Sequence, residues 1–228
     1  MNVNMTAREA ILGAVRLALP KPAVALPDEI HFLGKPRISS NVGYKGELPD
    51  LEKVAGFPAP EESLVPFFEK QLVAMGGRSF RVGSAMEARA KATELFPEAR
   101  VWASTVPEVP GNRRVRAGDS PGSFADVDVA VVRSRLGVAE AAAVWLDSED
   151  LVVPSLGVLA QHLIVMIDPS KIVPTLHEAY GGGLSGETNP YGVFMAGPSA
   201  TGDIEGVIIH GAQGARSLIV LFAEEELR

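Results

Sequence analysis

Hydroxyl, carboxylate and glycine residues gather in positions 197–205 of the sequence, GPSATGDIE. An apolar run precedes this segment and a periodic segment follows it, which predicts a strand that leads into a helix. The first N–H groups of such a helix lie at its positive end, so they can bind an anion at the carboxyl edge of an α/β sheet. The sequence therefore predicts a site for a small anion or carboxylate ligand, formed by Gly197, Ser199, Thr201, Asp203 and Glu205.

The same residues also fit a purely structural role. Thr201 would cap the helix, and Asp203 and Glu205 would complement its dipole without any ligand. The two acids would also repel an anion unless they point away from it or hold a hydroxyl group. The sequence leaves both roles open.

Glu140 is a second candidate, because it is the only charged residue between Arg135 and Asp147. The segment around it is apolar enough to be buried. An isolated buried carboxylate is costly, so Glu140 would pair with a cation or line a cavity. An outward-facing strand position is the structural alternative. We expect Glu140 to share a solvent-reached hollow with Ser199 and Thr201, where it would be a catalytic residue.

Other motifs argue against nucleotide and metal sites. Residues 181–186 satisfy G-x-G-x-x-G, but a helix is predicted before them and Pro190 follows, whereas the dinucleotide fingerprint needs a strand before it and a helix after it. A loop, or a flap over a pocket, is expected there. The sequence has neither a G-x-S-x-G pattern nor a P-loop. We predict no metal site, because metal-ligand spacing is absent among the histidines, which are His31, His162, His177 and His210. We also predict no cofactor.

Composition excludes several classes of function. The 228 residues carry a formal net charge of −7, which argues against a nucleic-acid partner. The absence of cysteine excludes disulfides, thiolate nucleophiles and cysteine-ligated iron–sulfur clusters, and it fits a reducing compartment. No apolar run reaches the ~20 residues that cross a bilayer, and the N-terminus resembles an amphipathic helix rather than a signal peptide. We therefore expect a cytoplasmic protein without a membrane span.

Two patterns along the chain predict the domain organisation. Residues 1–60 combine a helix at 6–19 with an irregular arm rich in proline and glycine. Residues 61–228 alternate helical and strand patterns, which predicts an α/β domain whose mixed, mostly parallel sheet is flanked by helices. The expected elements are helices at 61–75, 84–96, 169–179 and after residue 199, a hairpin at 136–146, and strands at 79–82, 99–103, 127–132, 163–167 and 217–222.

Three motifs carry a resemblance to known proteins: Gly197-Pro198-Ser199-x-Thr201-x-Asp203-Ile204-Glu205, Gly211-x-x-Gly214-x-Arg216-x-Leu218 and Ala139-Glu140. They resemble the motifs of the lactate utilization protein C family of LUD-domain proteins. The resemblance covers roughly residues 60–225. It implies an α/β fold similar to that of ribose-5-phosphate isomerase, glucosamine-6-phosphate isomerase and the CoA-transferases. It also implies a role in converting L-lactate to pyruvate beside iron–sulfur partner proteins.

One departure from the family pattern lies beside Glu140. The family has Thr-Gly-Thr after this glutamate, whereas this sequence has Ala141-Ala142-Ala143 and so lacks two hydroxyls and a glycine. An accessory component of lactate utilization is therefore weighed against two alternatives. The first is a stand-alone isomerase or CoA-transferase-like enzyme, with Glu140 as base or nucleophile and a phosphate or carboxylate held by Ser199 and Thr201. The second is a ligand-binding module without catalysis.

Overall fold

The computed structural model describes residues 64–184, 191–203 and 205–223. By its internal contacts the chain divides into two units, Met1–Glu47 and Leu48–Arg228, and the described residues belong to the second. The predicted N-terminal helix and arm, residues 1–60, lie outside the described residues. Among the described residues, no helix is long and apolar enough to cross a membrane.

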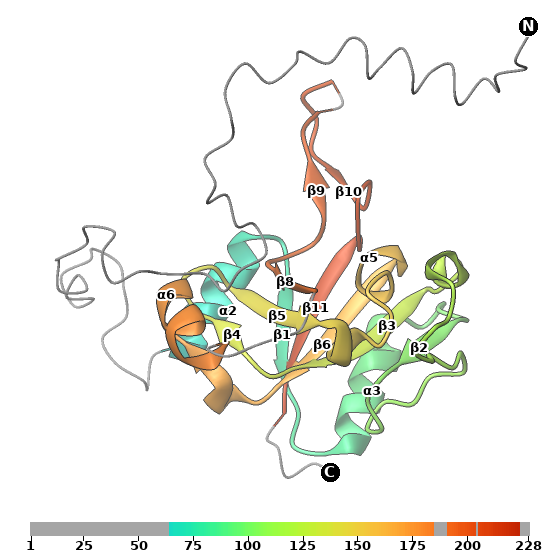
Figure 1. The fold of residues 1–228 in the computed structure, drawn as a ribbon, viewed down its shortest axis with the longest axis horizontal. Helices are drawn as coiled ribbons and strands as arrows, with labels where there is room; N and C mark the ends of the chain where they lie inside the picture. Colours follow the sequence, from blue (N-terminus) through green and yellow to red (C-terminus); the bar gives the residue numbers. More distant parts are fainter. Residues whose placement is uncertain (1–63, 185–190, 204, 224–228) are drawn as a thin grey trace, which may run out of the picture. The chain divides into compact units, whose positions relative to one another are not determined.

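A five-stranded parallel sheet forms the centre of the described unit (Figure 1). Its inner strands are continuous apolar runs, as expected when a parallel sheet is covered on both faces. The predicted α/β class with a mostly parallel sheet is confirmed. In spatial order the strands are β1 (Arg78–Arg81), β11 (Ser217–Phe222), β6 (His162–Ile167), β3 (Val129–Ser134) and β2 (Trp102–Ser104).

Alternate side chains of these strands enter two separate cores. Helix α3 (Ala85–Leu95) covers one face and buries Ala88 and Ala92 against it. Helix α2 (Leu64–Ala74) lies on the opposite face, where Phe68 and Leu72 are fully buried. The sheet is thus covered on both sides, which leaves its two edges, where the strands begin and end, as the places open to a ligand.

A second, four-stranded sheet packs on the same face as α2 and belongs to the same core. The hairpin predicted for residues 136–146 is confirmed as its strands β4 and β5. The sheet order is β7 (Ile172–Val173), β4 (Gly137–Val138), β5 (Ala143–Asp147) and β8 (Gly192–Met195). Short helical segments follow one strand of each sheet. They are α4 (Ser148–Leu151) and α5 (Leu156–Leu159) after β5, and the 3-10 turn η4 (Pro169–Lys171) after β6.

The single helix predicted for residues 169–179 is wrong. After η4 the chain forms β7, because Ile172 pairs with Gly137 in the second sheet. Thr175 then caps a new helical turn, α6 (Leu176–Glu178), which continues as a π-helical segment, η5 (Ala179–Gly183). Sheet pairing with a strand more than thirty positions away overrode the local helical period.

The helix predicted after residue 199 is also wrong, and a β-hairpin takes its place (Figure 1). Its strands are β9 (Ala200–Thr201) and β10 (Ile209–His210), so His210 lies on a strand rather than on a helix. Gly206 and Gly211 have φ values of +70° and +87°, which a right-handed helix does not allow. The β-branched residues at 207–209 also favour strand over helix.

Candidate functional site

The predicted ligand segment lies at the amino edge of the parallel sheet, and the prediction that it lies at the carboxyl edge is wrong. The N–H of Ser199 donates to the carbonyl of Ala215 at 2.8 Å, just before β11 begins. Next to it, the N–H of Arg216 donates to the carbonyl of Gln161, just before β6 begins. The physical reason is that β8 pairs antiparallel with β5 in the second sheet, so the end of β8 does not share the carboxyl edge.

The structure divides the five predicted ligand-binding residues between two places. Gly197 and Ser199 line a small hollow of about 220 Å³ whose other walls are mostly apolar, including Met195 and Leu163. The other three residues, Thr201, Asp203 and Glu205, belong to the hairpin. There the Thr201 hydroxyl accepts a hydrogen bond from the N–H of Asp203 at 3.2 Å, which closes a local turn instead of capping a helix. A ligand role for any of the five stays a prediction.

Glu140 lies in the turn between β4 and β5 and has a structural partner. Its Oε1 accepts a hydrogen bond of 2.6 Å from the N–H of Leu176, at the start of α6. The residues that line the hollow beside Ser199 do not include Glu140, so the structure does not bring these two candidates together there. A catalytic role for Glu140 stays a prediction, with no support from its surroundings.

A cluster of charged side chains that the sequence analysis missed lies at the carboxyl edge of the parallel sheet. Arg133 is near the end of β3, and its guanidinium donates to Oε1 of Glu108 at 2.6 Å. Glu108 comes from the loop after β2 and is only 4% exposed. Its second oxygen, Oε2, is buried and has no hydrogen-bond partner in the described part of the chain. Such an oxygen costs free energy unless a ligand or water donates to it.

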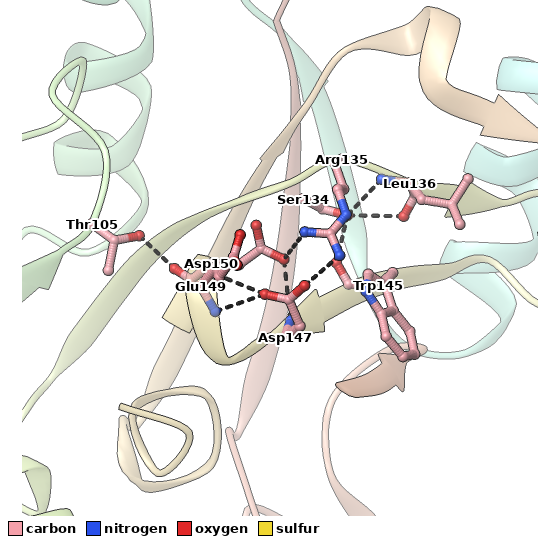
Figure 2. Close-up of polar contacts among 8 residues, drawn as sticks. All are labelled: Thr105, Ser134, Arg135, Leu136, Trp145, Asp147, Glu149 and Asp150. Carbon is pink, nitrogen blue, oxygen red and sulfur yellow. Dashed lines mark hydrogen bonds and ion pairs between the residues drawn. The ribbon is translucent and has the colours of Figure 1, made fainter. Parts of the chain in front are cut away.

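Beside this pair, Arg135 and Asp147 hold the start of α4 in place (Figure 2). Asp147 is fully buried and forms a capping box: its Oδ1 accepts from the N–H groups of Glu149 and Asp150, and Asp150 accepts from the N–H of Asp147. Burial raises the pKa of Asp147, but these two backbone hydrogen bonds and the guanidinium of Arg135 outweigh it and hold the pKa below its usual value.

Asp150 has the opposite shift. Burial raises the pKa of its carboxyl to about 6, and repulsion from the Asp147 carboxylate adds to this shift. The hydrogen bond from the Asp147 N–H and the attraction of Arg135, at 4.0 Å, lower the pKa but do not offset the rise. The backbone carbonyl of Asp150 accepts a hydrogen bond from the hydroxyl of Thr105 at 2.9 Å, which ties α4 to the end of β2 (Figure 2). Asp150 can therefore exchange a proton near neutral pH from a fixed position.

Glu108, Arg133 and Asp150 line a hollow of about 500 Å³, which we name the edge pocket. The carboxyl edge of an open α/β sheet is where such folds bind ligands. The guanidinium of Arg133 suits a carboxylate, and Oε2 of Glu108 suits a hydroxyl or another donor. No group of three or more metal-ligating side chains lies among the described residues. The polar residues that line the edge pocket are Thr105, Glu108, Arg133, Glu149 and Asp150.

Replacing Asp150 with Asn is expected to stabilise the protein at neutral pH. The pKa of Asp150 rises from 3.8 to about 6 on folding. Between these two pH values the folded state therefore holds a proton that the unfolded state has lost. Stability therefore falls as the pH rises from about 4 to about 6. The neutral amide avoids this loss, and we expect Asp150→Asn to gain about 1–3 kcal/mol at pH 7.5 and nothing near pH 4.

Urea unfolding at both pH values measures this gain. Glu98→Gln, at an exposed position, is the control and should show no such pH-dependent difference. A variant that is less stable than the wild type at pH 7.5 would show that the Asp150 carboxylate is favoured in the folded state.

A parallel sheet that is covered on both faces, with a charged pocket at its carboxyl edge, defines an α/β protein whose pocket lies where open α/β sheets bind ligands. Residues 121–223 match the family model of the LUD domain, and this span includes Arg133, Asp147 and Asp150. The predicted resemblance to LUD-domain proteins is confirmed over this span, and the LUD family is linked to lactate utilization.

One solved structure shows the same fold. It is the crystal structure of a DUF162 family protein from Deinococcus radiodurans, 17% identical to this chain, with a TM-score of 0.56. The match covers 73% of this chain and 99% of that chain. At this identity the similarity concerns the fold and not the ligand. Among the curated proteins, none matches the sequence.

Proposed function

We propose that the protein is an accessory component of an L-lactate utilization system, which converts lactate to pyruvate together with iron–sulfur partner proteins. The LUD-domain match over residues 121–223 supports the link to lactate. The sequence contains no cysteine, so this chain cannot hold a cluster through thiolates and depends on partners for electron transfer.

The edge pocket is the proposed binding site for the organic acid. Oε2 of Glu108 is the observation that carries this assignment, because it is buried, ionisable and without a donor within the described residues. A hydroxyl group of the ligand would donate to this oxygen once the Glu108 side chain turns it toward the edge pocket. Arg133, held in place by its ion pair with Glu108, would bind the carboxylate of the same ligand. A 2-hydroxy acid offers both groups on adjacent carbon atoms.

Deletion of the gene tests the role in lactate utilization. We expect the deletion to stop growth on L-lactate as the carbon source, and the wild-type gene to restore it. Glu108→Gln keeps the size of the side chain but replaces the free carboxylate oxygen, and it should weaken lactate binding about tenfold, close to the effect of losing one hydrogen bond to a charged group.

Isothermal titration with lactate and pyruvate measures the binding, and Glu98→Gln is the matched control on the surface. Unimpaired growth of the deletion strain would refute the role in lactate utilization. Equal affinity of the wild type and Glu108→Gln would remove the edge pocket as the binding site.

A second candidate function is a stand-alone enzyme acting on a small phosphorylated or carboxylate substrate. The specific observation in its favour is Asp150, whose pKa of about 6 suits general acid–base catalysis at the wall of the edge pocket. Glu108 and Asp150 fit such chemistry better than Glu140, whose Oε1 already accepts a backbone hydrogen bond. Turnover by the purified protein without partners, lost in Asp150→Asn, would establish this function. Ligand binding without turnover would instead identify a binding module.

A further inference from the structure

A second hollow, of about 410 Å³, lies next to the edge pocket and is lined by three arginines. They come from a short stretch of the loop after β2, and they stand out in a chain whose formal net charge is −7. Arginine is the side chain best suited to phosphate, because its planar guanidinium donates two parallel hydrogen bonds to one anionic group. The three are Arg113, Arg114 and Arg116.

The two hollows share a wall, since Thr105, Val106 and Pro107 line both of them. These residues follow directly after β2, so both hollows open at the carboxyl edge of the same strand. The edge pocket alone, at about 500 Å³, already exceeds what a three-carbon acid fills. Ligand pockets of about 300–1,000 Å³ suit molecules several times larger. One ligand can therefore extend from the acidic groups of the edge pocket to the arginines.

The loop that carries the arginines is fixed against β2 rather than merely lying on the surface. The N–H of Arg113 donates to the carbonyl of Trp102 at 2.8 Å, and the side chain of Asn112 accepts from the N–H of Trp102 and donates to the carbonyl of Arg100. At Gly111 the loop approaches so closely that a Cβ would lie 2.3 Å from the Trp102 carbonyl oxygen. Backbone held in this way presents its side chains in a preorganised arrangement.

The arginines differ in how far nearby acids neutralise them. Arg113 pairs with Asp126 and donates to the carbonyl of Ser123, so it is largely neutralised and fixed. Within the described part of the chain, no ion pair to a carboxylate occupies the side chain of Arg114 or Arg116. Asp119 is the acid of the same turn, and it accepts from the backbone N–H of Arg116. Arg114 and Arg116 thus line the hollow without an ion pair in the described part of the chain, and Asp119 is the carboxylate of the same turn.

We propose that Arg114 and Arg116 form an anion subsite beside the edge pocket, which binds the phosphate group of a small phosphate ester. The other end of that ligand reaches the edge pocket, where Glu108 accepts from its hydroxyl group. Only this second contact rests on the proposed function of the edge pocket. The arginine subsite stands on its own geometry.

Isothermal titration at constant ionic strength tests the subsite, with inorganic phosphate and 3-phosphoglycerate as the probes. We expect 3-phosphoglycerate to bind more tightly than phosphate, because it reaches both hollows. The double variant Arg114→Gln/Arg116→Gln should weaken both probes about tenfold or more, as expected for the loss of charged hydrogen bonds. Arg78→Gln, an exposed arginine on β1, is the matched control and should bind both probes like the wild type.

Glu108→Gln separates this inference from the proposed function. It should weaken 3-phosphoglycerate and leave inorganic phosphate unchanged. Phosphate binding that the double arginine variant does not weaken, or no binding of either probe, overturns the subsite even if lactate occupies the edge pocket. Equal binding of both probes, dependent on the arginines but not on Glu108, overturns the ester and identifies free phosphate as the ligand. In that case the separate titration with lactate still decides whether lactate binds in the edge pocket.

Discussion

Replacing Asp147 with Ala is expected to destabilise the protein by about 3–5 kcal/mol, the range for breaking a buried ion pair together with a helix cap. Asp147 is fully buried. Its Oδ1 accepts from the N–H groups of Glu149 at 2.7 Å and Asp150 at 3.0 Å, and its Oδ2 pairs with Arg135. The substitution leaves both N–H groups without their acceptor and removes the Asp147 carboxylate from the guanidinium of Arg135. The free energy of unfolding, from urea titration, measures the loss.

Asp126→Ala is the matched control, because Asp126 also pairs with an arginine but is 58% exposed. Exposed pairs contribute about 0–1 kcal/mol, so its loss should be small. The pKa of Asp147 is lowered on folding, so its stabilising effect is full above the unfolded pKa and disappears as the pH falls through the lowered value. The difference between wild type and Asp147→Ala should shrink in strong acid. Losses of equal size for both variants would contradict the buried pair.

The sequence predicted the parts of the fold whose signals are local. Strands β3, β6 and β11 each contain an apolar run of four or five residues, which is the pattern expected of strands buried on both faces. The helix predicted for residues 84–96 is confirmed as α3, and the hydroxyl of Ser84 caps it by accepting from the N–H of Glu87 at 3.1 Å. In each case neighbouring residues alone determine the element.

The parts that were missed depend on pairing between distant residues. The helical period at 169–179 was overridden because Ile172 pairs with Gly137 in the second sheet. The helical period after residue 199 was overridden because β9 and β10 pair as a hairpin. The edge pocket joins Glu108, in a loop rich in proline and glycine, to Arg133, 25 positions later on a buried strand. No periodic pattern in the sequence indicates that these two residues form an ion pair. The one available signal was that Arg133 ends the apolar run of β3 at its carboxyl end, and that a second arginine, Arg135, follows the strand directly.

The sequence-predicted segment 197–205 can be tested for a structural rather than a ligand role. Gly197 has a φ of +72°, and a Cβ there would lie 2.4 Å from the carbonyl oxygen of Met75 and 3.0 Å from its Cβ. Gly197→Ala therefore combines an unfavourable backbone conformation with a clash against the turn that follows α2. We expect a loss of about 3–5 kcal/mol, from about 1–2 kcal/mol for the conformation and the rest for the displaced backbone.

Gly206→Ala separates the two contributions, because Gly206 has nearly the same φ, +70°, and an added Cβ there would meet no atom of the described residues within 4 Å. Its expected loss is the conformational part alone, about 1–2 kcal/mol. Urea unfolding of both variants gives the difference, which measures how closely Gly197 approaches α2. If Gly197→Ala instead kept full stability and lost affinity for lactate or phosphate, close packing would not explain this glycine. A ligand at residues 197–199 would then be the better explanation, and the edge pocket would have a rival at the opposite edge of the sheet.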